Sequence, residues 1–144
     1  MSSPVIFEFF DGIRDRKYRV DEKTDDDDFI LCPYTKTIKL RDNLGRHVYA
    51  RALFTFKESG WTFDGENMRI RIESGCYPSG TYEGLFTADP SVSFTLQNIE
   101  FDYFRAKLNP RLPNNGLINV NIDDSVSYSI RNCYRLEQVF IPDQ

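Results

Sequence analysis

The sequence predicts an all-β protein, an antiparallel β-sandwich or jelly-roll-like barrel of roughly 8–10 strands with at most one short helix near 99–108. Apolar and polar residues alternate with a period of two along most of the 144 residues. Clusters of turn-forming residues separate the alternating runs. Helical periodicity with capping residues is absent, because strand-like alternation competes even in 99–108. This length fits a single domain over 1–144.

From the N-terminus, "PVIFEFF" is an apolar strand, and "QVFIP" places another near the C-terminus. Segments this close to chain ends fray unless something holds them, so we expect the sheet or a partner subunit to do so. An acidic connection at 21–28 leads into the strand that begins at Phe29. A hairpin is predicted between 35–41 and 47–57, with Gly45 in its turn free to take positive φ.

"FDGEN" predicts a second hairpin between "GWTF" and "MRIRI", because Asp-Gly favours tight turns. In the latter strand Met68 and Ile70 face the core, and Arg69 and Arg71 face solvent. "YPSG", "ADPS" and "IDDS" mark three more reversals, and no internal repeat is recognised. The inward positions of the remaining strands are Val92, Phe94, Leu96, Ile118, Val120, Ile122, Val126, Tyr128 and Ile130. The loop at 104–116 is a long surface excursion.

Four consecutive acids, Asp25, Asp26, Asp27 and Asp28, form a weak candidate cation site. A calcium loop of the EF-hand type needs glycine at its sixth position and glutamate at its twelfth. Counted from Asp25, those positions hold Ile30 and Lys36. The favoured interpretation is a solvated, charged segment that protects the next strand from wrong pairing.

The sequence contains no local motif typical of a catalytic site or a metal site. His47 is the only histidine and lies within an alternating strand. The three cysteines, Cys32, Cys76 and Cys133, lack the close spacing typical of structural zinc sites. We therefore expect no enzyme activity, no catalytic residue, no metal and no cofactor, and three cysteines that stay reduced and buried.

Charge and the N-terminal segment limit the partners. The net charge of −4 argues against binding to nucleic-acid phosphates or to an anionic membrane. The basic stretch "RDRKYRV" is flanked by acids, which predicts a salt-bridged strand surface. No signal-like segment precedes the first strand, so we expect a soluble protein made in the cytoplasm, without membrane insertion.

The function expected from these features is a non-enzymatic structural or adaptor subunit that binds other protein subunits in a homo- or hetero-oligomeric assembly. Analogy with small β-folds suggests a capsid, tail or decoration protein of a virus or bacteriophage virion. The alternatives are a carbohydrate- or other ligand-binding β-sandwich and a small acidic inhibitor protein. The candidate interface or binding residues are Trp61, Tyr77, Tyr82, Phe104, Arg105, Leu108, Arg111 and Leu112.

Overall fold

The computed structural model describes residues 3–20, 28–48, 53–75, 86–102 and 127–131. These residues form strands and no helix, so the predicted all-β class is confirmed. None of them belongs to a helix long and apolar enough to cross a membrane. The strands are β1 (Val5–Phe10), β2 (Asp15–Arg19), β3 (Phe29–Cys32), β4 (Thr37–Leu40), β5 (Leu44–Val48), β6 (Phe54–Phe56), β7 (Trp61–Gly75), β8 (Phe86–Ala88), β9 (Ser93–Asp102) and β10 (Ser127–Arg131).

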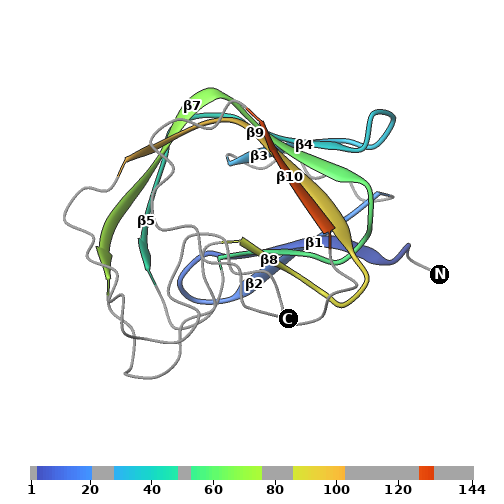
Figure 1. Cartoon of the computed structure of the whole chain (residues 1–144). Coiled ribbons are helices and arrows are strands. Elements are labelled where there is room, and N and C mark those ends of the chain that lie inside the picture. The colour runs from blue at the N-terminus through green and yellow to red at the C-terminus, as the bar shows by residue number, and fades with distance from the viewer. Residues whose placement is uncertain (1–2, 21–27, 49–52, 76–85, 103–126, 132–144) are drawn as a thin grey trace.

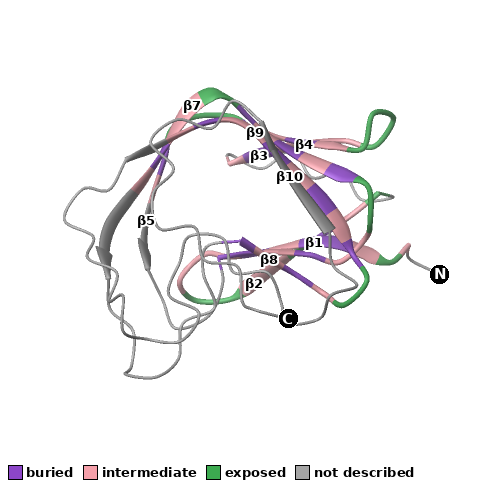
Figure 2. Cartoon of the chain, viewed as in Figure 1, coloured by how far each residue is buried: buried purple, intermediate pink, exposed green. Residues whose placement is uncertain are grey.

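The strands build two sheets that enclose the core (Figure 1). The small sheet has the order β2-β1-β6-β8, and the large sheet has the order β10-β9-β7-β4-β3, with β5 also paired to β7. Aromatic side chains fill the space between them: the rings of Phe54 in the small sheet and Phe63 in the large sheet lie 5.2 Å apart. Both side chains are fully buried, and buried residues occur in strands of both sheets (Figure 2). The arrangement is compatible with the predicted sandwich.

Both sheets are mixed, which departs from the antiparallel pairing predicted from the sequence. The pairs β1–β2, β1–β6 and β3–β4 are antiparallel. The pairs β6–β8, β4–β7, β5–β7, β7–β9 and β9–β10 are parallel. The reason is that the chain crosses from one sheet to the other after a strand, whereas a hairpin would return it within the same sheet.

Two such crossings are stacked on one another. In each, a small-sheet strand, a turn and a large-sheet strand form a unit that we call an arch: β6 and β7 joined by 57–60, and β8 and β9 joined by 89–92. The strand register superimposes them, since Phe54 pairs with Phe86 and Trp61 pairs with Phe94. Paired residues are 32 positions apart between β6 and β8, and 33 apart in the first part of β7 and β9, and this spacing defines a structural repeat. Beyond the register shift in β7 the spacing is 31.

The stacked arches are held together by polar contacts in the turns and by rings in the core. Ser59 Oγ accepts a hydrogen bond from Ser93 N at 3.0 Å and donates one to Ser91 O at 3.2 Å. Phe54 and Phe86 stack with ring centroids 4.6 Å apart and planes inclined by 14°. Like residues in successive units thus contact each other, as in other repeat proteins.

The predicted hairpin at "FDGEN" is wrong, because β7 runs through it as one bent strand. Its register with β9 shifts between Asp64 and Met68, and the extra residues form a bulge. Glu66 and Asn67 have φ of 53° and 62°, and the chain stays extended on both sides. The Asp-Gly signal is real, but it produces a local bend, because both halves of the strand keep β9 as a neighbour.

The predicted hairpin between 35–41 and 47–57 is also wrong. β4 and β5 both pair in parallel with β7, one with each of its halves. Gly45 lies within β5 and pairs with Arg71, and the glycines with positive φ in the described residues are Gly12 and Gly60. The alternating run from 47 to 56 is divided, since β5 belongs to the large sheet and β6 to the small one.

The structure exposes an internal repeat that the sequence analysis missed. The parallel register of β9 and β10 pairs Ser93 with Ser127 and Gln97 with Arg131, 34 positions apart. On that register "ADPSVSFTLQ" aligns with "IDDSVSYSIR". The first five residues of the second block, 122–126, lie outside the described residues, and so do the predicted inward positions Ile118 and Val120.

The N-terminal apolar run is held by the sheet itself, since β1 lies between β2 and β6. The C-terminal run lies outside the described residues. Of the segment 99–108, in which a short helix was predicted, the structure describes residues 99–102, and these belong to β9. The inward positions predicted for β7 and β9 are confirmed, with Ile70, Phe94 and Leu96 buried.

Candidate functional site

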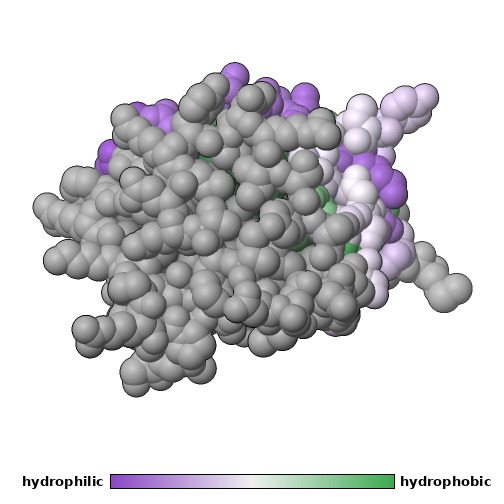
Figure 3. Space-filling model, in the orientation of Figure 1, coloured by the Kyte–Doolittle hydropathy of each residue, from purple (hydrophilic) through white to green (hydrophobic). Residues whose placement is uncertain are grey.

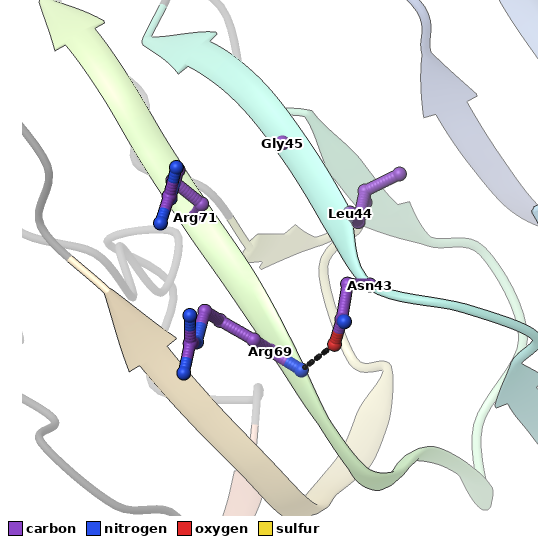
Figure 4. Close-up of a pocket in the computed structure, with 5 residues that line it drawn as sticks. All are labelled: Asn43, Leu44, Gly45, Arg69 and Arg71. Carbon is purple, nitrogen blue, oxygen red and sulfur yellow. Dashed lines mark hydrogen bonds between the residues drawn. The ribbon is translucent and has the colours of Figure 1, made fainter.

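The strongest candidate site is an open hollow on the large sheet where β5 runs beside β7. It encloses about 260 Å³ and is lined by Asn43, Leu44, Gly45, Arg69 and Arg71 (Figure 4). The hollow lies just beyond the bend of β7, whose residues Glu66 and Asn67 are exposed (Figure 2). The described residues along the upper rim of the molecule present a hydrophilic surface (Figure 3).

Strand alternation explains which side chains reach this surface. Ile70 is fully buried, so Arg69 and Arg71 on either side of it point to the outer face of β7. Residues two apart on a strand are separated by about 6.6 Å, so the two guanidinium groups share one patch of surface. In the close-up both arginine side chains extend from β7 toward the same side (Figure 4).

The neighbouring strand leaves room beside these arginines. Gly45, which has no side chain, is the residue of β5 paired with Arg71. Asn43 precedes β5, and its Oδ1 accepts a hydrogen bond from the backbone N–H of Arg69 at 2.8 Å. Because the oxygen of this amide is engaged, its NH2 group remains as a further donor at the hollow.

Acidic residues lie on the opposite side of β7. Arg69 pairs in the strand register with Glu100 and Arg71 with Asp102. The Arg69 Nη2 atom lies 3.9 Å from Glu100 Oε1, a long ion pair between side chains that are 43% and 32% exposed. Arg69 is thus bordered by the carboxylate of Glu100 toward β9 and by the hollow toward β5.

Sequence reasoning placed Arg69 and Arg71 correctly on the solvent face but did not recognise a site. The alternation in "MRIRI" identifies two outward arginines. It does not reveal that "DNLG" lies next to them, because that neighbour is set by the parallel pairing of β5 and β7. A glycine within an alternating strand was the available signal, since it often marks a close approach or an opening.

Trp61, proposed from the sequence as a binding residue, is in the core. It is 1% exposed, and its Nε1–H donates a hydrogen bond to Glu58 Oε2 at 2.6 Å. The prediction that Trp61 offers its ring to a sugar or a partner is therefore wrong. Its place at the start of β7, opposite Phe94, makes it a core residue of the stacked arches.

Asp28 is the one member of the acidic run among the described residues, and Asp25, Asp26 and Asp27 lie outside them. Arg16 Nη2 lies 3.0 Å from Asp28 Oδ2, and Arg16 Nε lies 3.2 Å from Asp11 Oδ2. The predicted salt-bridged surface is confirmed at Arg16. Backbone N–H groups of Arg14 and Ile13, together with Arg16, lower the pKa of Asp11 to about 2.

A second carboxylate, Asp64, ties the bend of β7 to β9. Its oxygens accept hydrogen bonds from Glu66 N at 2.8 Å, Gln97 Nε2 at 3.0 Å and Asn98 Nδ2 at 3.1 Å. Burial raises the pKa of this carboxyl, but the three hydrogen bonds and the charge of Lys39 outweigh burial and hold the pKa below its ordinary value. Its contacts hold β7 against β9, which is a structural role.

The other predicted site residues are not placed. Tyr77, Tyr82, Phe104, Arg105, Leu108, Arg111 and Leu112 lie outside the described residues, as do Cys76 and Cys133. Cys32 is a half-buried free thiol at the end of β3. Within the described ranges, no three histidine, cysteine or acidic side chains gather as a metal site.

Comparison with known proteins gives no relative for this chain: no family model, no curated protein and no solved structure matches it. The fold defines a two-sheet β-protein with stacked arches.

Proposed function

We propose that this protein is a non-enzymatic structural subunit of a larger assembly, which it joins by strand addition at the β8 side of the small sheet. Strand addition gives affinity through main-chain hydrogen bonds and specificity through alternate side chains. The setting favoured by analogy with small β-folds is a virus or bacteriophage particle.

The observation that carries this proposal is the difference between the two edges of the small sheet. β2, at one edge, reads Asp-Arg-Lys-Tyr-Arg, with Lys17 exposed. β8, at the other edge, reads Phe-Thr-Ala, and its one neighbour in the described part of the chain is β6. Charged edge strands discourage pairing with other chains, and uncharged ones permit it.

The stacked arches support the same function. Each arch lies on the one before it in parallel register, so the body grows in one direction from the antiparallel strands β1 to β3. Repeat architectures of this kind are stabilised by contacts between neighbouring units and need a terminal cap to remain soluble. A partner strand at β8 continues that series.

The test is the native mass, measured by analytical ultracentrifugation. It is measured for the purified full chain and for the complex isolated from its natural source. Thr87 lies between buried Phe86 and Ala88 and faces outward, so Thr87→Lys places a charge at the edge. We expect this variant to remain folded and to lose the assembly. Thr55→Lys, at the paired position on β6, is the matched control and should assemble.

A monomer at high concentration that also turns over a small substrate would refute the proposal. An assembly that survives Thr87→Lys would refute the role of the β8 edge. Both measurements use circular dichroism and thermal melting of the variants to show that each is folded.

A further inference from the structure

We propose that β3, at the edge of the large sheet, pairs with β3 of a second copy of this chain, so that two large sheets join across a two-fold axis. The two strands run antiparallel, and the axis passes through Leu31. This inference goes beyond the proposed function, since it names a second interface and its partner and does not depend on the β8 edge.

The first argument is the position and composition of β3. It is the last strand of the large sheet, and β4 is its one neighbour within the described residues. It reads Phe-Ile-Leu-Cys, without a charge, and Ile30, Leu31 and Cys32 are half-buried. Natural edge strands are usually protected by charged side chains, and an uncharged apolar edge invites pairing with another strand.

The second argument is the direction of the backbone groups of β3. Arg41 N–H donates a hydrogen bond to the carbonyl oxygen of Asp28 at 2.9 Å, so the backbone of Asp28 faces β4. Because this direction alternates along a strand, Ile30 and Cys32 also face β4, and Leu31 directs its N–H and C=O away from the sheet. A two-fold axis at Leu31 lets these groups exchange hydrogen bonds with the same groups of the second copy.

The side chains determine the register of the two strands. Ile30 and Cys32 lie on the outer face, because they alternate with Leu31, which packs against the core. With the axis at Leu31, Ile30 of each copy lies opposite Cys32 of the other, and two half-buried apolar side chains meet. An axis at Ile30 would instead place Cys32 against Asp28. Pro33, which has no N–H, ends the pairing beyond Cys32.

The third argument is charge, and it selects a second copy as the partner. The run of four aspartates ends at Asp28, directly before β3, and Arg16 offsets one of these four charges. A cation, Lys36, follows β3 in the exposed turn that leads to β4. An antiparallel pair of identical strands places the basic end of one beside the acidic end of the other, whereas a parallel pair would place like charges together. The edge is therefore self-complementary, as a two-fold interface requires.

The turn between β3 and β4 supplies an anchor for this contact. Tyr34 in this turn is fully exposed, and the turn stands out from the sheet (Figure 2). Hydrogen bonds fix the turn: Lys36 N donates to Pro33 O at 3.3 Å, and Thr35 Oγ1 donates to Thr37 Oγ1 at 3.0 Å. In the antiparallel dimer Tyr34 points toward the start of β3 in the second copy. Tyrosine is enriched among the residues that dominate interfaces, and a fixed turn loses little entropy on binding.

The experiment is disulfide cross-linking of the full chain between two single-cysteine variants. Both carry Cys76→Ser and Cys133→Ser; one keeps Cys32, and the other has Ile30→Cys with Cys32→Ser. Opposite residues that do not hydrogen bond to each other have Cα atoms about 4.5 Å apart, within the roughly 4.4–6.8 Å that a disulfide spans. We expect a covalent dimer when the two variants are mixed and oxidised. Neither variant alone should form it, because identical positions lie two residues out of register.

Sedimentation equilibrium measures the affinity, in the Thr87→Lys background that removes the β8 contact. The paired segment is short, so we expect a dimer that forms at high protein concentration. Ile30→Glu should raise the dissociation constant about tenfold or more, because it places a charge against an apolar side chain of the second copy. Thr62→Glu adds the same charge at a half-buried outward position of the central strand β7 and should leave the dimer intact. Lys36→Glu should weaken the dimer, because it makes both ends of β3 acidic.

Cross-linking that is as efficient in either variant alone as in the mixture would overturn the proposal. So would a chain that stays monomeric at high concentration in the Thr87→Lys background, or an affinity that Ile30→Glu leaves unchanged. If Ile30→Glu does not fold, as judged by circular dichroism, the cross-linking result decides. Loss of assembly in Thr87→Lys with cross-linking retained shows that the two interfaces are separate.

Discussion

Gly65 lies in close contact with the neighbouring arch, so Gly65→Ala tests the stacking directly. A Cβ added there would lie 2.5 Å from the carbonyl oxygen of Asn98 and 2.8 Å from Ile99 Cγ1. The nearest atom is backbone and belongs to β9, so no side-chain rotation relieves the clash. Because Gly65 is not among the glycines with positive φ, the effect is steric and does not come from backbone strain.

We expect Gly65→Ala to lower the free energy of unfolding by about 1–3 kcal/mol, the usual cost of overpacking. In a chain of this length, that corresponds to a fall in melting temperature of roughly 3–10 °C. Urea denaturation followed by far-ultraviolet circular dichroism measures the change, and differential scanning calorimetry checks it.

Gly60→Ala is the matched control. Gly60 has φ of 88°, and an added Cβ would meet only the Lys36 side chain, at 3.7 Å. Its cost is that of an alanine in the left-handed region, roughly 1–2 kcal/mol, with no clash. If Gly65→Ala unfolds at the same denaturant concentration as the unmodified chain while Gly60→Ala is destabilised, the close contact between β7 and β9 is refuted.

Two further predictions concern the same body. Phe86→Ala removes a ring stacked on Phe54 and should cost about 3–5 kcal/mol by urea denaturation, with Phe86→Leu costing clearly less; equal costs would refute the stacked-ring packing. The lowered pKa of Asp64 means that its contribution to stability is present above the ordinary carboxyl pKa of 3.8 and is lost as the pH falls through the folded-state value. Asp64→Asn should therefore be less stable than the unmodified chain at pH 7, and this difference should shrink at pH 3; a difference independent of pH would show that the charge is irrelevant.

The sequence predicted strands well because strand alternation is a local property. In β7, buried Ile70 between outward Arg69 and Arg71 follows from side-chain direction alone. The pairing was not predictable in the same way, since a half-buried strand shows the same alternation beside a parallel or an antiparallel neighbour.

The turn residues in "FDGEN" led to the wrong prediction of a hairpin for a physical reason. Asp64 and Gly65 form the dipeptide typical of tight hairpins, but the following Glu66 and Asn67 absorb the extra length as a bulge. The outcome depends on Asn98 and Gln97 of β9, which hydrogen bond to Asp64 across more than thirty positions of sequence.

The candidate site was hidden for the same reason. Its residues come from two short segments that carry no motif, and only the parallel pairing of β5 with β7 brings Gly45 beside Arg71. The similarity of "ADPSVSFTLQ" and "IDDSVSYSIR" is the signal in the sequence that indicates parallel stacking of repeats.

The spacing between superimposed arches restricts how such a chain can change in length. Inserting one residue into a strand turns every later side chain of that strand to the wrong face. Duplicating a whole block of 31 to 34 residues instead keeps every side chain of the copy on the face that its original occupies. Proteins related to this one should therefore differ in length by whole repeats and not by single residues within a strand.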